Sequence, residues 1–148
     1  MRMNLPTIII DTREQEPYGF PPGSCFTVRR KLDSGDYSVD GWEDSVAVER
    51  KSLDDFVKTL IPPKRRWFDE LERLAGMTSC VVVEAGWPDV FARKYNSGAH
   101  PESIWGGSMN IISKYGIPVY LCGNRQIACK FTYDFLKNFW IERTKNEK

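Results

Sequence analysis

Residues 48–55 read VERKSLDD and place three acids and two bases among eight positions. The stretch begins at the end of the apolar run Val46-Ala47-Val48, which is typical of a buried strand. A short distance upstream, Gly35-Asp36-Tyr37 adds another acid beside apolar residues. Acidic and basic side chains are almost never fully buried without a partner, so this strand end is the first place to search for a functional site.

The composition is that of an ordinary globular chain of 148 residues, with 41% hydrophobic and 28% charged residues. The net charge of +1 leaves no overall basic field, and the triplets Arg29-Arg30-Lys31 and Lys64-Arg65-Arg66 are by themselves typical of a solvated surface. Four cysteines without a C-x-x-C pair and a single histidine argue against a zinc site or a disulfide framework. No apolar stretch is long enough for a membrane span and the N-terminus is no signal peptide, so we expect an intracellular, cytoplasmic protein with no membrane partner.

The order of the expected elements predicts the fold class. Short apolar runs predict strands over residues 8–10, 25–30, 37–39, 46–48, 80–83 and 117–122. The expected helices follow Ser52, run from the break at Pro62-Pro63 to about Leu74, cover residues 87–95 and 101–116, and follow the cap Asn124. This order predicts an α/β fold with a mixed central sheet flanked by helices on both faces.

Two helices carry apolar stripes at the helical period, which we expect to face the core. In the second helix the stripe consists of Phe68, Leu71, Leu74 and Ala75. In the last helix it consists of Ile127, Ala128, Phe131, Phe135 and Phe139.

The charged stretch belongs to an expected hairpin, because Asp40-Gly41 predicts a turn between two strands. With a short loop, the antiparallel register sets Asp36 opposite Glu49. Side chains alternate along a strand, so Lys51 shares the face of Glu49, whereas Arg50 points to the other face. The hairpin therefore gathers two acids and a lysine on one side of the sheet.

Two carboxylates that face each other repel, and a purely structural sheet gains nothing from them. A divalent cation such as Mg²⁺ or Mn²⁺ reverses this balance, since it binds through one or two carboxylates, water and substrate phosphate. Lys51 can hold the attacking water or offset charge on the phosphate. The arrangement has the parts for metal-assisted hydrolysis of a phosphodiester. Asp11 adds a third acid if the strand over residues 8–10 neighbours the hairpin.

Plainer interpretations stay open for several of these residues. For Glu49 and Lys51 alone, a surface ion pair is the default. A local salt bridge explains Arg13 and Glu14 equally well. Ser52-x-x-Asp55 has the form of a helix capping box, so this acid is interpreted as a cap.

Three motifs occur together in this order: Asp11-Thr12-Arg13-Glu14, Gly35-Asp36-Tyr37 and Glu49-Arg50-Lys51-x-x-x-Asp55. Together they resemble the nuclease domain of the XPF-type structure-specific endonucleases, whose signature is G-D-x-n-E-R-K-x-x-x-D. The resemblance continues into residues 68–74, 81–86 and 115–119 and covers about residues 7–140. It implies a restriction-endonuclease-like α/β core and a single nuclease domain over residues 1–148.

The resemblance also implies an activity and a site. The implied activity is that of a metal-dependent DNA endonuclease, which cleaves branched, flap or otherwise structured DNA in repair, recombination or replication. The catalytic residues carried over are Asp36, Glu49, Lys51 and Asp11, with Mg²⁺ or Mn²⁺ held by the three acids. The expected substrate-binding residues are Arg13, Arg50 and Arg66, and the motif or structural positions are Asp55, Gly35 and Glu14.

The resemblance has two further consequences. We expect no helix-hairpin-helix module after the domain, and the loop over residues 15–24 is similar to that of short stand-alone bacterial and phage members. Dimerisation through the late helices is implied, for which Phe131, Phe135, Phe139 and Trp140 supply aromatic surface. The alternative function is a catalytically inactive DNA-binding or scaffold subunit, and action on RNA is a third possibility.

Overall fold

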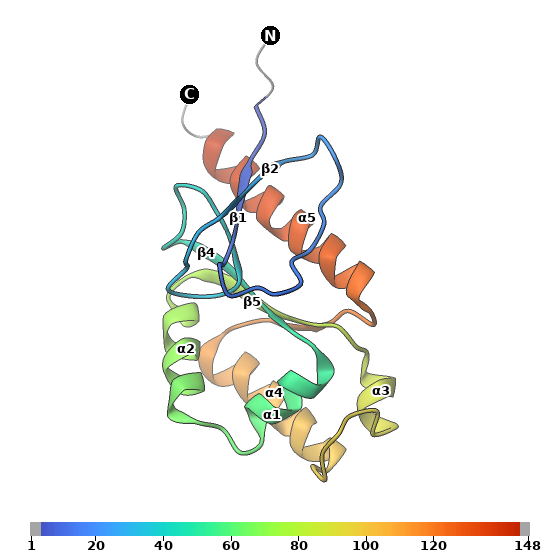
Figure 1. The fold of residues 1–148 in the computed structure, drawn as a ribbon. Helices are drawn as coiled ribbons and strands as arrows, with labels where there is room; N and C mark the ends of the chain where they lie inside the picture. The colour runs from blue at the N-terminus through green and yellow to red at the C-terminus, as the bar shows by residue number, and fades with distance from the viewer. Residues whose placement is uncertain (1–3, 146–148) are drawn as a thin grey trace.

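The structure is a computed structural model that describes residues 4–145 (Figure 1). The outermost residues of the predicted domain, 1–3 and 146–148, lie outside the described residues. The strands are β1 (Thr7–Ile10), β2 (Phe26–Arg29), β3 (Tyr37–Val39), β4 (Val46–Lys51), β5 (Thr78–Val83) and β6 (Val119–Leu121). The helices are α1 (Leu53–Leu60), α2 (Arg65–Ala75), α3 (Trp87–Phe91), α4 (Pro101–Tyr115) and α5 (Arg125–Thr144).

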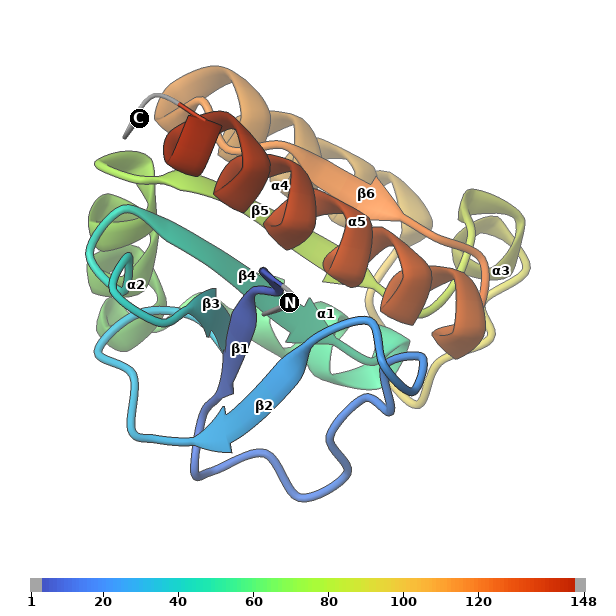
Figure 2. The ribbon, with the colours of Figure 1, turned by 90° about the horizontal axis from the view of Figure 1, so that it is seen from above.

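The strands form one mixed six-stranded sheet in the order β2-β1-β3-β4-β5-β6 (Figure 2). β3 runs antiparallel to both of its neighbours, and the other pairs are parallel. Tyr37 at the start of β3 lies opposite Ile10 at the end of β1 and opposite Val48 in β4. The carboxyl ends of β1 and β4 and the amino end of β3 therefore lie together at one end of these strands.

Helices cover both faces of the sheet, as the sequence predicts. α1, α2 and α4 pack on one face, and among the helices of residues 4–145 only α5 packs on the other (Figures 1 and 2). β5 is buried on both sides, because Val81 and Val83 face the first layer while Cys80 and Val82 face α5. Burial on both faces explains its continuous apolar run. None of the helices in residues 4–145 has the length and apolar character to cross a membrane.

Most predicted elements are confirmed, including the caps. Ser52 and Asn124 accept hydrogen bonds from the N–H groups of Asp55 and Ile127 at the starts of α1 and α5. Three elements are shorter than predicted, of which β2 covers Phe26–Arg29 rather than residues 25–30. α3 ends at Phe91 rather than near residue 95, because Ala92 caps it and Arg93 has a φ of 56°. β6 pairs with β5 only over Val119–Leu121.

The prediction of the α2 stripe was partly wrong. Leu71 and Leu74 are buried, but the third buried side chain of α2 is Trp67. Phe68 is half-buried and Ala75 is exposed. Positions 67, 71 and 74 follow the helical period, so they form the face that packs on the sheet.

The prediction of the α5 stripe was also partly wrong. Ala128 and Phe139 are buried, but Ile127 is 50% exposed, and Phe131 and Phe135 are only partly buried. The remaining buried side chains of α5 are Thr132, Tyr133 and Leu136. The sequence pattern passed over Thr132 as polar, yet its hydroxyl donates to the backbone carbonyl oxygen of Ala128 at 2.8 Å and so enters the core satisfied.

Gly35 ties the turn before β3 to the strand beside it. Its φ is 76°, a conformation that residues other than glycine adopt at a cost. A Cβ atom at this position would lie 2.8 Å from the Cβ of Ala47 and 3.2 Å from the carbonyl oxygen of Val48. The turn thus packs against β4 only because position 35 has no side chain.

We predict that Gly35→Ala lowers the free energy of unfolding by about 2–5 kcal/mol, since it adds a steric clash to backbone strain. Gly41→Ala is the matched control: Gly41 has a φ of 87°, but a Cβ there meets no atom within 4 Å. The control should lose only about 1–2 kcal/mol. Urea denaturation of both variants measures the difference, and equal losses would contradict the clash.

Candidate active site

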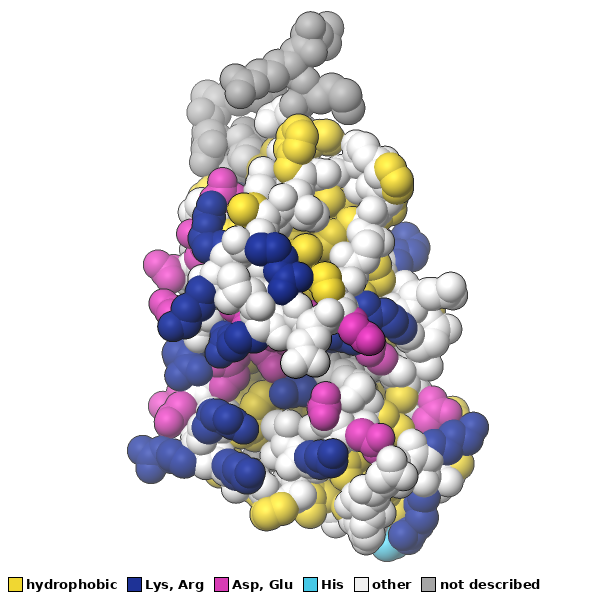
Figure 3. Space-filling view, in the orientation of Figure 1, with side chains coloured by type: hydrophobic (Ala, Val, Ile, Leu, Met, Phe, Trp, Pro, Cys, Tyr) yellow, Lys and Arg dark blue, Asp and Glu magenta, His cyan; other side chains and the backbone are white. Residues whose placement is uncertain are grey.

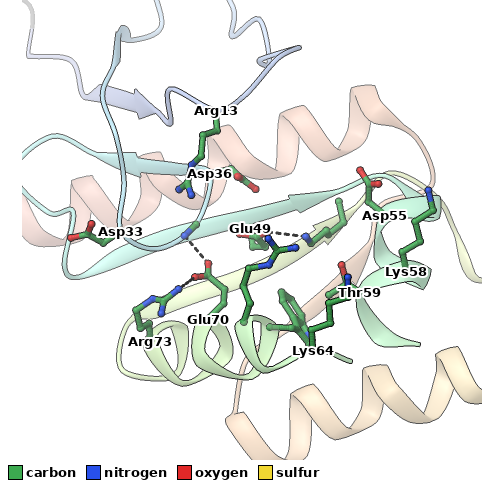
Figure 4. Close-up of a pocket in the computed structure, with 14 residues that line it drawn as sticks. Arg13, Asp33, Asp36, Glu49, Asp55, Lys58, Thr59, Lys64, Glu70 and Arg73 are labelled. Atoms are coloured by element: carbon green, nitrogen blue, oxygen red, sulfur yellow. Dashed lines mark hydrogen bonds and ion pairs between the residues drawn. The ribbon is translucent and has the colours of Figure 1, made fainter. Parts of the chain in front are cut away.

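The acidic strand ends open into a cleft of about 660 Å³ beside α1 and α2 (Figure 4). Seven of the ten predicted site residues line it: Arg13, Gly35, Asp36, Glu49, Lys51, Asp55 and Arg66. The other three, Asp11, Glu14 and Arg50, do not. The structure therefore brings together the acid pair and the lysine that the hairpin argument placed on one face.

Asp36 is held in place by the backbone on both sides. Its N–H donates to the carbonyl oxygen of Val48 at 2.8 Å, and its carbonyl oxygen accepts from the N–H of Asp11 at 2.9 Å. Its carboxylate Oδ2 accepts a hydrogen bond from the N–H of Arg50 at 2.8 Å. Together with Tyr37 opposite Val48, these contacts confirm the predicted register, in which Asp36 faces Glu49.

The pKa values of Asp36 and Glu49 reflect the burial of two carboxylates close together. Desolvation by the surrounding protein raises the pKa of Asp36 to about 7, although the hydrogen bond from Arg50 N–H opposes the rise. Burial, and then the charge of Asp36, raise the pKa of Glu49 well above its ordinary value. The cleft thus disfavours two ionised carboxylates unless a cation joins them.

Lys51 is positioned by two contacts. Its Nζ lies 3.2 Å from Oε2 of Glu49 and 5.3 Å from the centroid of the Trp67 ring. A cation over an indole face is attracted by the ring quadrupole. The ammonium group is therefore held beside the acid pair, where it can offset negative charge on a phosphate.

Asp11 lies beside the cleft without lining it. Its fully buried carboxylate accepts hydrogen bonds from Arg13 Nε at 2.7 Å and from the N–H of Leu32 at 2.8 Å. Burial opposes ionisation, but these hydrogen bonds outweigh it and lower the pKa of Asp11. Both carboxylate oxygens have partners, so this arrangement does not support the prediction of Asp11 as a metal ligand.

Arg50 lies on the opposite face of the sheet, where it does not support the prediction of substrate binding. Its Nε and Nη2 donate to the two carboxylate oxygens of Glu84 at 2.8 and 3.2 Å, and its Nη1 lies 3.2 Å from Oε2 of Glu14. The Tyr18 ring covers its guanidinium at 5.1 Å. Hydrogen bonds to Glu84 raise the pKa of Arg50 despite its desolvation. Glu14 therefore pairs with Arg50 rather than with Arg13.

Glu70 is a cleft residue that sequence reasoning did not single out. Its Oε1 accepts the N–H of Gly35 at 2.9 Å, and its Oε2 lies 2.6 Å from Arg73 Nη2 (Figure 4). It thereby connects α2 to the turn that carries Asp36. Arg66, Glu70 and Arg73 lie four and three positions apart, and this polar stripe was the available signal.

The donor set of the cleft fits a hard divalent cation. Within residues 4–145 no group of three or more His, Cys, Asp or Glu side chains could hold a metal on its own. Mg²⁺ does not need one, since it binds through one or two carboxylates and completes its shell with water and substrate phosphate. Asp36 and Glu49 supply such a pair, and because burial raises both pKa values, a cation bound between them would favour their ionised forms.

Comparison with known proteins identifies the family. A model of the ERCC4 domain matches residues 10–135. The chain belongs to the ERCC4 domain family. Members of this family are typically phosphodiester hydrolases, and its nucleases use divalent metal ions.

The ERCC4 chain is also similar to individual proteins. A Methanocaldococcus jannaschii protein named as an ATP-dependent RNA helicase is 29% identical over 119 residues, which cover 80% of this chain and 14% of that protein. Among solved structures, XPF from Aeropyrum pernix matches with a TM-score of 0.68 and 22% identity, over 96% of this chain and 69% of that one. Its complex with DNA matches with a TM-score of 0.65 and 24% identity, over 93% and 66%. The predicted restriction-endonuclease-like α/β fold is thereby confirmed as XPF-like.

We predict that the metal-free protein loses stability as the pH rises from about 4 to about 7. Over this range the native protein retains protons on Asp36 and Glu49 that the unfolded chain releases, because burial raises both pKa values. A divalent cation competes with these protons. Adding Mn²⁺ should therefore raise the melting temperature more at pH 8 than at pH 6.

The measurement is thermal unfolding across this pH range, with and without Mn²⁺. Asp36→Asn should flatten the pH dependence and remove the effect of Mn²⁺. Asp69→Asn removes an exposed carboxylate that pairs with Arg65 outside the cleft and should change neither. An equal Mn²⁺ effect at both pH values would contradict the prediction.

Proposed function

We propose that the protein is a metal-dependent DNA endonuclease that hydrolyses phosphodiester bonds. The observation that carries the proposal is the cleft in which Asp36, Glu49 and Lys51 meet. A Mg²⁺ or Mn²⁺ ion on the two carboxylates would lower the pKa of a bound water and neutralise charge on the phosphate. Membership of the ERCC4 family supports this chemistry.

The side chains divide the remaining work. Lys51, held beside Glu49 and Trp67, offsets the charge that develops on the phosphate oxygens. Arg13 and Arg66 contact phosphates of the bound strand, since both are exposed and line the cleft. Asp11 acts by orienting Arg13, because its own oxygens are engaged.

The remaining motif residues have structural roles in this proposal. Gly35 permits the turn that carries Asp36, and Glu14 pairs with Arg50 behind the sheet. The N–H of Asp55 donates to the Ser52 hydroxyl at 3.2 Å, as a helix cap requires, while its side chain lines the cleft.

The proposed substrate is branched, flap or otherwise structured DNA of the kind that arises in repair, recombination or replication. The support is the G-D-x-n-E-R-K-x-x-x-D motif and the fold shared with XPF from Aeropyrum pernix, of which a DNA complex is known. The open cleft at the edge of the sheet has room for a backbone segment.

We further propose that two copies pair through β6 and the adjoining face of α5. β6 is an edge strand, and its Tyr120 packs on Phe131 with ring centroids 4.4 Å apart. Ile127 lies one turn before Phe131 on α5, and Tyr120 and Ile127 expose 44% and 50% of their surfaces. Phe139 does not contribute, because it is buried against Trp42. A second copy would cover this apolar surface and the open strand edge.

Asp36→Asn, Glu49→Gln and Lys51→Met should each reduce DNA cleavage by at least about a hundredfold, because each removes a group on which the chemistry depends. Asp69→Asn should leave the rate unchanged. Cleavage of labelled branched, flap and single-stranded DNA and of matched RNA, with Mg²⁺ or Mn²⁺, measures the effect. Wild-type protein that binds DNA but never cuts it would favour the inactive DNA-binding subunit instead.

Ile127→Glu should convert the dimer to a monomer, because a carboxylate in an apolar interface carries a desolvation cost. Ile141→Glu is the control, since Ile141 is 39% exposed on the far end of the same helix. Sedimentation velocity of the wild type and both variants measures the change. Wild-type protein that stays monomeric, or equal effects of the two substitutions, would refute this interface.

A further inference from the structure

Three cations without ionic partners line the cleft from the last turn of α1 and the start of α2. Lys58 lies in the last turn of α1, Lys64 caps α2, and Arg66 lies in the first turn of α2. All three line the cleft, and within residues 4–145 their side chains form no ion pair or hydrogen bond. The acid Asp55 lies at the same end, so this end keeps an excess of positive charge (Figure 4).

The cations at the other end of the cleft already have ionic partners. Arg13 pairs with Asp11 at 2.7 Å, and Arg73 pairs with Glu70 at 2.6 Å. Asp33 also lies at that end (Figure 4). The cleft is therefore electrostatically asymmetric, and a polyanion gains most at the end formed by Lys58, Lys64 and Arg66.

The triplet Lys64-Arg65-Arg66 is divided by this arrangement. Lys64 and Arg66 line the cleft, whereas Arg65 does not line it and pairs with Asp69 at 3.2 Å. The Lys and Arg side chains on this face of the molecule stand among acidic ones (Figure 3), so total charge does not distinguish a binding surface. The binding surface is distinguished instead by cations that line the cleft and have no ionic partner.

The direction of α2 sets the length of the site. Arg66 and Arg73 line the same wall seven residues apart, which corresponds to about 10 Å along a helix axis. A stacked strand rises about 3.4 Å per nucleotide, so this wall spans roughly three nucleotides. A strand along α2 would thus place one phosphate near the acid pair and a neighbouring phosphate at the unpaired cations.

We propose that Lys58, Lys64 and Arg66 form a phosphate-binding subsite for the phosphodiester next to the one at Asp36 and Glu49. The proposal rests on the proposed nuclease function for the identity of the ligand. The subsite binds the sugar-phosphate backbone without reading bases, so it holds the strand in the cleft whatever its sequence.

The experiment measures binding, so that it does not depend on cleavage. Fluorescence anisotropy of a labelled branched DNA in EDTA, over a series of salt concentrations, compares wild type with Lys58→Gln/Lys64→Gln. The slope of log K against log salt should become less steep by about 1.8, and affinity near 0.1 M salt should fall on the order of tenfold to a hundredfold. Arg65→Gln is the matched control and should change the slope far less.

Each outcome decides one proposal. An unchanged slope in the double variant, or an equal change in Arg65→Gln, would overturn the subsite. A wild type that binds with the expected slope but never cuts with Mg²⁺ or Mn²⁺ would refute the nuclease and leave the subsite standing. If the double variant binds more weakly than the wild type only when the DNA ends carry a 5′-phosphate, the site binds a terminal phosphate. That result would overturn the proposed subsite for an internal phosphodiester. Lys58 and Lys64 are exposed, so thermal unfolding of the double variant should match the wild type.

Discussion

The repulsion between two desolvated carboxylates, Asp36 and Glu49, is the constraint around which the rest of the site is arranged. The register of β3 and β4 sets them opposite each other, and neither can move away without breaking the backbone pairing around Tyr37 and Val48. The protein reduces the cost with the N–H of Arg50 on one carboxylate and the ammonium of Lys51 on the other. Since Mg²⁺ binds through one or two carboxylates, the pair is suited to hold a divalent cation.

The sheet separates two groups of charged side chains that are neighbours in the sequence and lie on opposite faces. Glu49, Arg50 and Lys51 are consecutive, yet alternation along β4 sends the middle residue to the far side. There Arg50 joins Glu84, which also receives hydrogen bonds from Tyr18 and Arg125. These contacts link the loop after β1, the end of β5 and the start of α5 behind the site. Because the N–H of Arg50 holds Asp36, the anchored side chain on one face supports the acid on the other.

Local signals predicted much of the fold and the centre of the site. Alternation placed Glu49 and Lys51 on one face, and the turn at Asp40-Gly41 was enough to infer the pairing of Asp36 with Glu49. The errors arose where a pattern allowed two similar faces. On α5 the aromatic positions 131 and 135 lie one step from the buried Thr132 and Leu136. Hydrophobicity alone favours positions 131 and 135, whereas the face that packs on the sheet also includes the polar Thr132, which the pattern passes over.

The sequence by itself determined that this chain forms an α/β domain with an acid pair and a lysine at a strand end. Those features depend on periods of two and 3.6 residues and on local turn chemistry. Only the tertiary structure decided the role of each charge, because that depends on partners distant in the chain. The carboxylate of Asp11 accepts a hydrogen bond from the N–H of Leu32, 21 positions away. The carboxylate of Glu70 accepts one from the N–H of Gly35, 35 positions away. Arg65 and Arg66 are neighbours in the sequence, but only Arg66 lines the cleft, whereas Arg65 pairs with Asp69.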